Sequence, residues 1–387
     1  MKNLLETKDL VTNFYTYEGV VKALDKVSIE IKHGQTFGLV GESGCGKSVT
    51  VRSIMRIIQQ PGKIESGEVL YCDDAESDEC DELLSKSEAW MRELRGDRIS
   101  MIFQEPNAAL NPVLTIGEQV AESYMFHRKR SISKQVLKDV AEGKSSFGLF
   151  HPFLKWVYST AAANPNARLL KVLDRIPLLK LWRRPLHREA IRRSVKIIGK
   201  LGISNPEEIV TRYPHNLSGG MKQRIVIAIA LACNPTLLIA DEATSNLDVT
   251  IQAQILDLLG ELKRKKAISS VLLITHDLGV VAETCDRVGV MYAGTLCEVA
   301  DVKDLFNSPQ HPYTKALLNS VPRFCVEGEL ATIEGSVPNL VTPPSGCRFH
   351  PRCKSATEIC KTQKPELVDL GNGHMAACHN IQVKAED

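Results

Sequence analysis

Residues 41–48 of this chain have the composition of a loop that binds phosphate groups. They read GESGCGKS, after an apolar run at 36–40 that predicts a buried strand and before a segment at 49–58 that predicts a helix. Glycines allow successive backbone N–H groups to point into one concavity, and the start of a helix adds positive dipole. Lys47 would reach the outer phosphates of a nucleoside triphosphate, and the Ser48 hydroxyl would bind Mg²⁺. The alternative is a glycine-rich turn that happens to precede a lysine, which the four specified positions and both flanks disfavour.

Two adjacent carboxylates and a histidine follow buried strands later in the chain. The apolar run at 236–240 ends at Asp241 and Glu242, and the run at 270–275 ends at His276. Asp241 would bind Mg²⁺ through water, and Glu242 would act as general base on the attacking water. His276 would hold the terminal phosphate oxygen and that water, although a histidine after a strand is often structural. Adjacent acids at the end of a buried strand cost desolvation energy, which favours a function for this pair.

Two further side chains are candidates to contact a nucleotide. Gln104 follows a buried strand at 99–103, where a glutamine can bind Mg²⁺ and touch the attacking water. Tyr17 lies between strand-like runs at 4–14 and 20–31, where its ring could stack on adenine. Phe14 and Tyr15 are the alternatives for stacking, and any of the three could merely pack against the sheet.

A second anion-binding helix start is predicted at 217–224, which reads LSGGMKQR. Ser218 is a good helix N-cap, and the two glycines after it expose backbone N–H groups. One nucleotide rarely needs two helix N-termini from one chain, so we expect two chains that face each other. The residues expected to contact the nucleotide bound mainly by the partner chain are Ser218, Gly219, Gly220 and Gln223.

The composition limits the kinds of partner. The chain has 387 residues, 43% hydrophobic and 24% charged, with a net charge of +2. This balance is ordinary for a globular protein, and it lacks the strongly basic face that nucleic acid would require as the main partner. No apolar run is long enough to span a membrane, and residues 1–9 do not form a signal peptide. We therefore expect a cytosolic protein that reaches a membrane only through other chains.

The segment at about 130–185 is unusual. Its aromatic residues at 147–158 are spaced as on one helix face, and a basic stretch follows at 168–200. An amphipathic insertion lying on a membrane surface or on another subunit is one interpretation. A helical hairpin that buries its aromatic residues internally is the other, and it is favoured because the aromatic and basic parts are separate in the sequence.

The eleven cysteines fall into two groups. Seven are scattered, and such cysteines are usually small core residues or inert thiols: Cys45, Cys72, Cys80, Cys233, Cys285, Cys297 and Cys325. Four lie close together near the end of the chain: Cys347, Cys353, Cys360 and Cys378. Four thiolates suit zinc or an iron–sulfur cluster, with His350, His374 and His379 as spare ligands for zinc. Free cysteines or a disulfide are the alternatives.

Taken together, these motifs resemble the nucleotide-binding subunit of an ABC ATPase. The resemblance rests, in order, on 41–48, Gln104, 217–223, 237–242, 245–248 and His276. Further stretches at 290–294, 311–318 and 346–353 are similar to the oligopeptide/dipeptide importer ATPases. The similarity fails at about 130–185, where those subunits are usually shorter, and residues 245–248 have asparagine where alanine is commoner.

The resemblance implies a fold. It is an α/β P-loop ABC ATPase core at 1–300, with an antiparallel β arm and a helical signature subdomain at about 105–232 that contains the insertion. A small metal-stabilised extension would follow at 301–387. The four clustered cysteines match those of several relatives similar in carrying a [4Fe–4S] cluster, so we expect that cluster, with a structural role, and zinc as the alternative.

The resemblance also implies an activity and partners. The chain would hydrolyse ATP with Mg²⁺ to power import of dipeptides or oligopeptides, with oligosaccharides or metal chelates as alternative solutes. The residues expected around the phosphates are Gly41, Ser43, Gly44, Cys45, Gly46, Lys47, Ser48 and Val49. Its partners would be a second ATPase chain, two membrane permease subunits and an external solute-binding protein. The second ATPase is expected to be a different chain, and the protein would lie at the cytoplasmic face of the membrane, bound to the permease subunits. A soluble ABC ATPase not coupled to transport is the rival from another class.

Overall fold

The computed structural model describes residues 2–74, 76, 79–142, 151–165, 167–173, 182–243, 249–264, 268–320 and 333–381. The chain divides into two compact units. The first unit comprises Met1–Met91, Thr236–Ser245 and Gly260–Asp387, and the second comprises Arg92–Pro235 and Asn246–Leu259.

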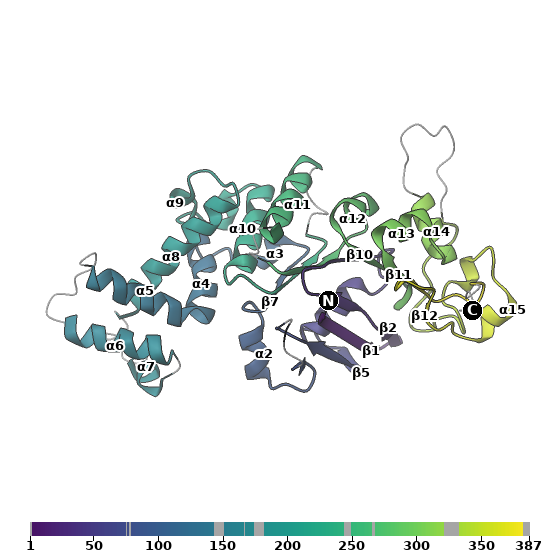
Figure 1. Ribbon diagram of the computed structural model, residues 1–387, viewed down its shortest axis with the longest axis horizontal. Coiled ribbons are helices and arrows are strands. Elements are labelled where there is room, and N and C mark those ends of the chain that lie inside the picture. Colours follow the sequence, from purple (N-terminus) through teal and green to yellow (C-terminus); the bar gives the residue numbers. More distant parts are fainter. Residues whose placement is uncertain are drawn as a thin grey trace. The chain divides into compact units, whose positions relative to one another are not determined.

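The first unit begins with an antiparallel sheet. Its strands follow the spatial order β2-β1-β5-β6, and β3 also pairs with β1. Their bounds are β1 (Asn3–Thr16), β2 (Gly19–Val27), β3 (Glu30–Lys32), β5 (Gly62–Tyr71) and β6 (Asp81–Glu82). Figure 1 shows β1, β2 and β5 side by side. This sheet is the antiparallel arm that the resemblance implies.

A second sheet carries the residues of chemical interest. Its strands in the first unit follow the order β12-β13-β11-β10-β4-β9-β8. Their bounds are β4 (Thr36–Val40), β8 (Leu237–Asp241), β9 (Ser270–Ile274), β10 (Arg287–Tyr292), β11 (Thr295–Asp301), β12 (Val368–Asp369) and β13 (Met375–Ala376). β10, β4, β9 and β8 are parallel neighbours, and every residue of β4, β8 and β9 is buried. Continuous apolar runs suit parallel strands covered on both faces, and the three strands predicted from such runs are confirmed.

Helices complete the first unit. They are α1 (Lys47–Ile54), α12 (Leu278–Thr284), α13 (Val302–Asn307), α14 (Pro312–Asn319), the 3₁₀ turn η4 (His350–Arg352) and α15 (Glu358–Thr362). Helix α1 begins two residues earlier than the predicted segment at 49–58 and ends earlier. It ends where Arg56 adopts a φ of 52°, which a continuing α-helix does not allow. Two helices contain residues of both units, α2 (Glu88–Leu94) and α11 (Val249–Arg264).

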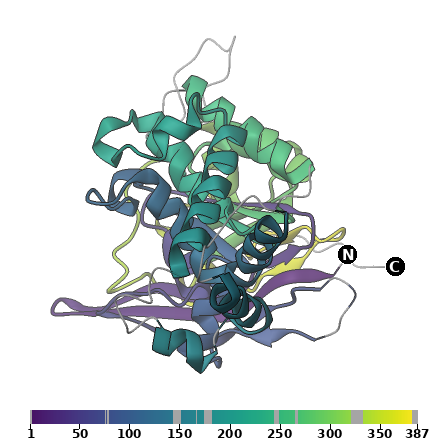
Figure 2. The ribbon, with the colours of Figure 1, turned by 90° about the vertical axis from the view of Figure 1, so that its left-hand side faces the viewer.

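The second unit is mainly helical. It contains β7 (Ile99–Ile102), α3 (Pro106–Ala109), α4 (Ile116–His127), α5 (Lys129–Ala141), α6 (His151–Ala163), α7 (Arg168–Leu173), α8 (Arg183–Lys200), α9 (Pro206–Ile209), the 3₁₀ turn η3 (Pro214–Asn216) and α10 (Gly219–Leu231). A capping box of Thr115 and Glu118 starts α4. Figure 2 shows these blue and teal helices packed together, as the contacts of α4 with α8 and of α5 with α6 require. Within the described ranges, every helix is too short or too polar to span a bilayer.

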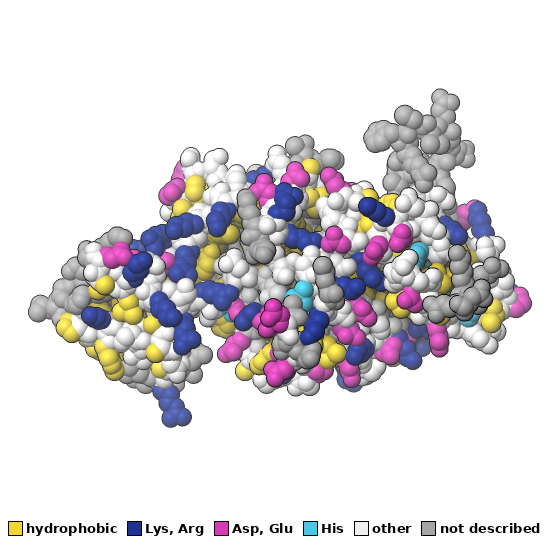
Figure 3. Space-filling model, viewed as in Figure 1, with side chains coloured by type: hydrophobic (Ala, Val, Ile, Leu, Met, Phe, Trp, Pro, Cys, Tyr) yellow, Lys and Arg dark blue, Asp and Glu magenta, His cyan; other side chains and the backbone are white. Residues whose placement is uncertain are grey.

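The unusual insertion folds as helices α5, α6, α7 and the start of α8. Tyr158 is buried against Trp182, and its hydroxyl donates to the Trp182 carbonyl at 2.7 Å. Phe153 and Trp156 on the same helix are 39% and 52% exposed, so internal burial holds for only part of the aromatic set. Two further aromatics of the pattern, at 147 and 150, lie outside the described residues. Lys and Arg side chains gather on the face of the second unit that Figure 3 shows.

One expectation about the scattered cysteines is wrong. Cys72 and Cys80 form a disulfide, with Cα atoms 4.3 Å apart. The cause is the sheet: β5 and β6 pair Tyr71 with Asp81, which places the next residue of one strand beside the preceding residue of the other. The expectation of small buried thiols holds for Cys45, Cys233, Cys285 and Cys297, and Cys325 lies outside the described residues.

Candidate functional site

The phosphate loop joins the end of β4 to the start of α1. Gly41 has a φ of 151°, and a Cβ there would lie 2.2 Å from the Met291 carbonyl oxygen, so only glycine fits. Lys47 is 5% exposed, and its ammonium donates to the carbonyls of Gly41 at 2.8 Å and Glu42 at 3.1 Å. The lysine is therefore folded over the loop that it serves. Gly44 lies at a φ of 78° in open space, which leaves room beside the loop for a phosphate group.

The end of β8 meets the start of α1. The Ser48 hydroxyl donates to Asp241 Oδ1 at 2.8 Å, and Asp241 is 1% exposed. Burial raises the pKa of the Asp241 carboxyl, against the hydrogen bond from Ser48 and the charge of Arg52, which lower it. A carboxylate and a hydroxyl at this separation supply the hard oxygen ligands that Mg²⁺ prefers. The structure thus joins two residues that are far apart in the sequence and were predicted to share the metal.

Glu242 and His276 also come together. His276 Nδ1 lies 3.7 Å from Glu242 Oε1, and the Glu242 N–H donates to the Ile274 carbonyl at 3.0 Å. That backbone bond links the carboxyl ends of β8 and β9, which are neighbours in the sheet. Glu242 has a φ of 47°, a left-handed conformation that costs a non-glycine residue energy and is often found at functional sites.

The adenine-stacking candidates differ in exposure. Tyr17 is 99% exposed in the turn between β1 and β2. The Tyr15 hydroxyl instead donates to Glu65 at 2.7 Å, and Phe14 lies against Gly62. Of the three, Tyr17 is the one whose ring is free of the sheet, and its role stays a prediction.

The remaining predicted residues belong to the second unit. Ser218 caps α10, and its Oγ accepts the Met221 N–H at 3.3 Å, as the sequence predicts. A Cβ at Gly219 would meet nothing, so the helix start is open on that side. Gln223 is buried and Gln104 is exposed. Their contacts with Mg²⁺ or nucleotide stay predictions, and the predicted turn at 245–248 lies outside the described residues.

The C-terminal extension is tied to the first unit by ion pairs and strand pairing. Arg348 is 6% exposed and donates to the Ala293 carbonyl and to Asp25 Oδ2, the latter at 3.1 Å. His374 Nε2 lies 2.7 Å from Glu298 Oε1, and β13 pairs with β11. These contacts tie the extension to the rest of the first unit.

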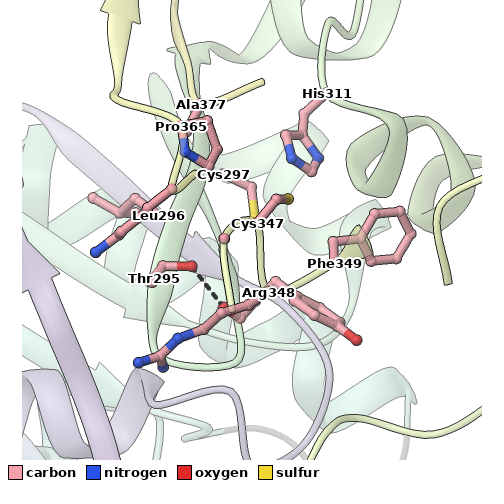
Figure 4. A pocket seen from close by; sticks show the side chains of 12 residues that line it. Thr295, Leu296, Cys297, His311, Cys347, Arg348, Phe349, Pro365 and Ala377 are labelled. Atoms are coloured by element: carbon pink, nitrogen blue, oxygen red, sulfur yellow. Dashed lines mark hydrogen bonds between the residues drawn. The ribbon is translucent and has the colours of Figure 1, made fainter. Parts of the chain in front are cut away.

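All four clustered cysteines line one cavity. Its walls also include His311, His350 and His379. Backbone N–H groups of Phe349, Ser355 and Asn380 hydrogen-bond to the sulfurs of Cys347, Cys353 and Cys378, and the Thr357 N–H donates to Cys360 Sγ at 3.5 Å. Burial raises the pKa of the Cys347 thiol to about 11, which favours its protonated form. Figure 4 shows a neighbouring cavity, in which Cys297 and Cys347 lie beside His311.

The expected metal-stabilised extension is not supported. In the part of the chain that the structure describes, no three His, Cys, Asp or Glu side chains are placed to hold a metal ion. The four sulfurs share a cavity, and each accepts a hydrogen bond from a backbone N–H group. The four thiols have the donor chemistry of a metal site, but as placed in the described residues they are not grouped as metal ligands.

Two contacts of the phosphate loop escape motif analysis. The Glu42 N–H donates to the Tyr313 hydroxyl at 3.0 Å, and Arg352 pairs with the Glu42 carboxylate. Tyr313 and Arg352 lie within the stretches at 311–318 and 346–353 that carry the resemblance to peptide importers. These stretches could be singled out by their resemblance, but the sequence alone does not predict that they contact residues 41–48.

Comparison with known proteins agrees with this geometry. The family described as "ABC transporter" matches residues 24–245, and the one described as "Oligopeptide/dipeptide transporter, C-terminal region" matches 297–360. A probable peptide ABC transporter ATP-binding protein of Sinorhizobium fredii is 42% identical, over 97% of this chain and 94% of that protein. A dipeptide transport ATP-binding protein of Bacillus subtilis is 40% identical, over 100% of this chain and 97% of that protein.

Solved structures support the fold. A dimeric ATP-binding cassette bound to ADP and Pi, MJ0796, matches with a TM-score of 0.54 at 23% identity, over 77% of this chain and 98% of that chain. The resemblance drawn from the motifs is confirmed. The chain belongs to the ABC transporter family, and in residues 297–360 it carries the C-terminal region of oligopeptide/dipeptide transporters.

Proposed function

We propose that this protein hydrolyses ATP to power an ABC importer of dipeptides or oligopeptides. The observation that supports the ATPase activity is the contact of Ser48 with Asp241 beside Lys47, because it joins the proposed Mg²⁺ ligands to the phosphate loop. The peptide substrate is supported by the relatives named for peptide, dipeptide and oligopeptide transport. Oligosaccharides and metal chelates remain the alternative solutes.

The residues of the site divide the chemistry among them. Lys47 and the N–H groups of the loop hold the phosphates, while Ser48 and Asp241 arrange Mg²⁺. Gln104 of the second unit stays the predicted further ligand. Glu242 takes the proton from the attacking water, and His276 beside it holds the terminal phosphate oxygen. Positioning and charge stabilisation supply most of the catalysis of phosphoryl transfer, which suits a site built from the ends of rigid strands.

The proposed assembly follows from the open start of α10. Ser218, Gly219 and Gly220 would contact a nucleotide bound mainly by a second ATPase subunit, which we propose to be a different chain. Two permease subunits would hold the pair at the cytoplasmic face of the membrane, and an external binding protein would deliver the solute. Copurification with integral membrane proteins and ATP-dependent uptake of a labelled dipeptide into vesicles would support this role. Release of the chain without membrane partners would favour a soluble ABC ATPase.

The test of the catalytic assignment is Glu242→Gln. We expect ATP binding to be kept and turnover to fall by roughly 10²–10⁴, the span for loss of a general base. Glu283→Gln changes an exposed glutamate on α12 and is the matched control. Turnover is measured by phosphate release from the full chain, and undiminished hydrolysis would remove Glu242 from this role.

We also propose that the four-cysteine cavity holds a [4Fe–4S] cluster, with zinc as the alternative. The support is that Cys347, Cys353, Cys360 and Cys378 line one space and that each sulfur accepts a backbone N–H, as cluster thiolates commonly do. Iron and acid-labile sulfide are measured on anaerobically purified protein. Both should be lost in Cys353→Ser and kept in Cys233→Ser. Zinc alone, or no metal, would defeat the proposal.

A further inference from the structure

Glu42 of the phosphate loop is held from two sides by the C-terminal part of the first unit. Its carboxylate accepts two hydrogen bonds from the guanidinium of Arg352, at 2.8 Å from Nη1 and 3.2 Å from Nη2. Its backbone N–H donates to the Tyr313 hydroxyl at 3.0 Å. Glu42 therefore has both its charge and its backbone fixed by residues that follow the ATPase motifs in the sequence.

Arg352 is itself rigidly placed. Besides the two bonds to Glu42, Nη1 donates to the Tyr292 hydroxyl at 3.2 Å, Nη2 to the Ile333 carbonyl at 3.1 Å and Nε to the Glu334 carbonyl at 2.9 Å. A guanidinium has five N–H donors, and these bonds occupy them all. The side chain is 7% exposed and its charge stands 5.7 Å from the centre of the Tyr292 ring. Such a two-point pair with a planar guanidinium is both strong and directional.

Tyr313 is fixed by packing. Its side chain is fully buried, and its ring centre lies 4.7 Å from that of Tyr292 and 5.3 Å from that of Phe349. The hydroxyl therefore cannot follow the loop if the loop moves. The Glu42 carbonyl, on the same residue, accepts a hydrogen bond from the Lys47 ammonium, so the position of Glu42 also bears on the phosphate-binding lysine.

A carboxylate inside a phosphate loop raises an electrostatic problem. Two negative groups repel each other, more strongly where water is partly excluded, and the Glu42 side chain is 23% exposed. Arg352 removes this repulsion by pairing with the carboxylate. An ion pair that merely tied the extension to the core could be made at many surface positions, whereas this one neutralises a charge in the loop that binds an anion.

We propose that Arg352 and Tyr313 are positioning residues for nucleotide binding: Arg352 neutralises the Glu42 carboxylate, and Tyr313 fixes the backbone of the loop. The C-terminal extension is then part of the ATP site rather than an appendage. Arg352, which neutralises Glu42, directly precedes Cys353 of the four-cysteine cavity. A metal bound in this cavity, or oxidation of Cys353, would therefore act next to Arg352. The inference rests on the proposed binding of nucleotide at residues 41–48.

The test is binding of ADP with Mg²⁺, which the protein cannot hydrolyse, to the full chain by calorimetry. Arg352→Gln leaves the Glu42 carboxylate unpaired, and we expect affinity to fall by about tenfold. Adding Glu42→Gln removes the repulsive charge, and we expect the double variant to recover to within about threefold of the parent. Lys364→Gln is the matched control, because Lys364 binds Asp25 away from the loop, and it should bind ADP normally.

Each other outcome has a definite meaning. Normal affinity in Arg352→Gln, or a loss that Glu42→Gln does not relieve, would overturn the charge-neutralising role and leave Arg352 as an anchor of the extension. Tyr313→Phe keeps the ring and removes only the acceptor, so it tests the second contact without disturbing the fold; we expect a loss of about two- to fivefold, and parental affinity would remove Tyr313 from the role. Failure of the parent chain to bind ADP would instead refute nucleotide binding at the loop.

Discussion

At the scale of single residues, two buried arginines of the first unit form ion pairs, and each pair joins parts of the chain that are remote in sequence. Arg348 reaches Asp25, and Arg352 reaches Glu42. An ionised group buried without a partner is strongly destabilising, so each of these cations depends on its anion. The two pairs therefore couple the stability of the C-terminal extension to that of residues near the start of the chain.

Asp25 gives a pH-dependent prediction. Burial raises its pKa, but the hydrogen bond from Lys364 and the charges of Lys364 and Arg348 outweigh burial, and the pKa is lowered overall. Its stabilising contribution is therefore present above the pKa of an unfolded aspartate and is lost as the pH falls through the lowered value, below about pH 4. We expect Asp25→Asn to lower the free energy of unfolding by about 2 kcal/mol at pH 7, because Arg348 loses a charged partner.

Urea unfolding at pH 7 and at pH 3 checks this expectation. The two proteins should differ at pH 7, and the difference should shrink at pH 3, where the parent carboxyl begins to protonate. Asp301→Asn is the control, since Asp301 is exposed and its side chain does not cap α13. An equal difference at both pH values would show that the carboxylate charge is not responsible.

The convergence of the candidate site residues of the first unit could be predicted because it depends on local sequence. Lys47 and Ser48 follow one buried strand, and Asp241 and His276 follow two others. Parallel strands in the order β4-β9-β8 end at one edge, so residues placed after apolar runs must converge. The partners of Glu42 could not be predicted, because Tyr313 and Arg352 lie 271 and 310 residues further on, and no local pattern encodes such contacts.

At the scale of elements, strand pairing decides features that residue types leave open. Strands β4, β8 and β9 can be recognised in the sequence as continuous apolar runs. Strands β6 and β13 are two residues long and form only because a partner strand is adjacent. The Cys72–Cys80 disulfide is a consequence of such a pairing, which is why the composition suggested free thiols there.

This disulfide should stabilise the arm measurably. A link between residues eight positions apart restricts the unfolded chain by about 2.5 kcal/mol in the loop-entropy account. We expect a reductant such as dithiothreitol to lower the melting temperature of the parent protein. The double variant Cys72→Ser and Cys80→Ser should melt at the reduced value and should not respond to reductant. A parent melting temperature that ignores reductant would mean that the bond contributes nothing.

At the scale of the whole molecule, the C-terminal extension is structurally joined to the ATPase core. Residues 297–360 match the C-terminal region of oligopeptide/dipeptide transporters, and within the first unit they contact the phosphate loop and strand β2. The fold of the core follows from periodicity and motifs. The docking of the extension does not, because it depends on polar contacts of high sequence separation and on the packing of Tyr313 and Phe349 against Tyr292.

Strand β13 also covers a strand edge that could otherwise pair with another chain. It covers β11, and the Ala377 N–H donates to the Cys297 carbonyl at 2.8 Å. Without this cover, β11 would present bare N–H and C=O groups along a mostly buried, apolar strand, which is a template for pairing with another chain. We expect Ala377→Pro, which lacks that N–H, to form aggregates detectable by light scattering, while Ala377→Ser stays monodisperse. An unchanged particle size in the proline variant would contradict this. Strand β13 would then limit self-association of the protein, so this segment would affect its solubility.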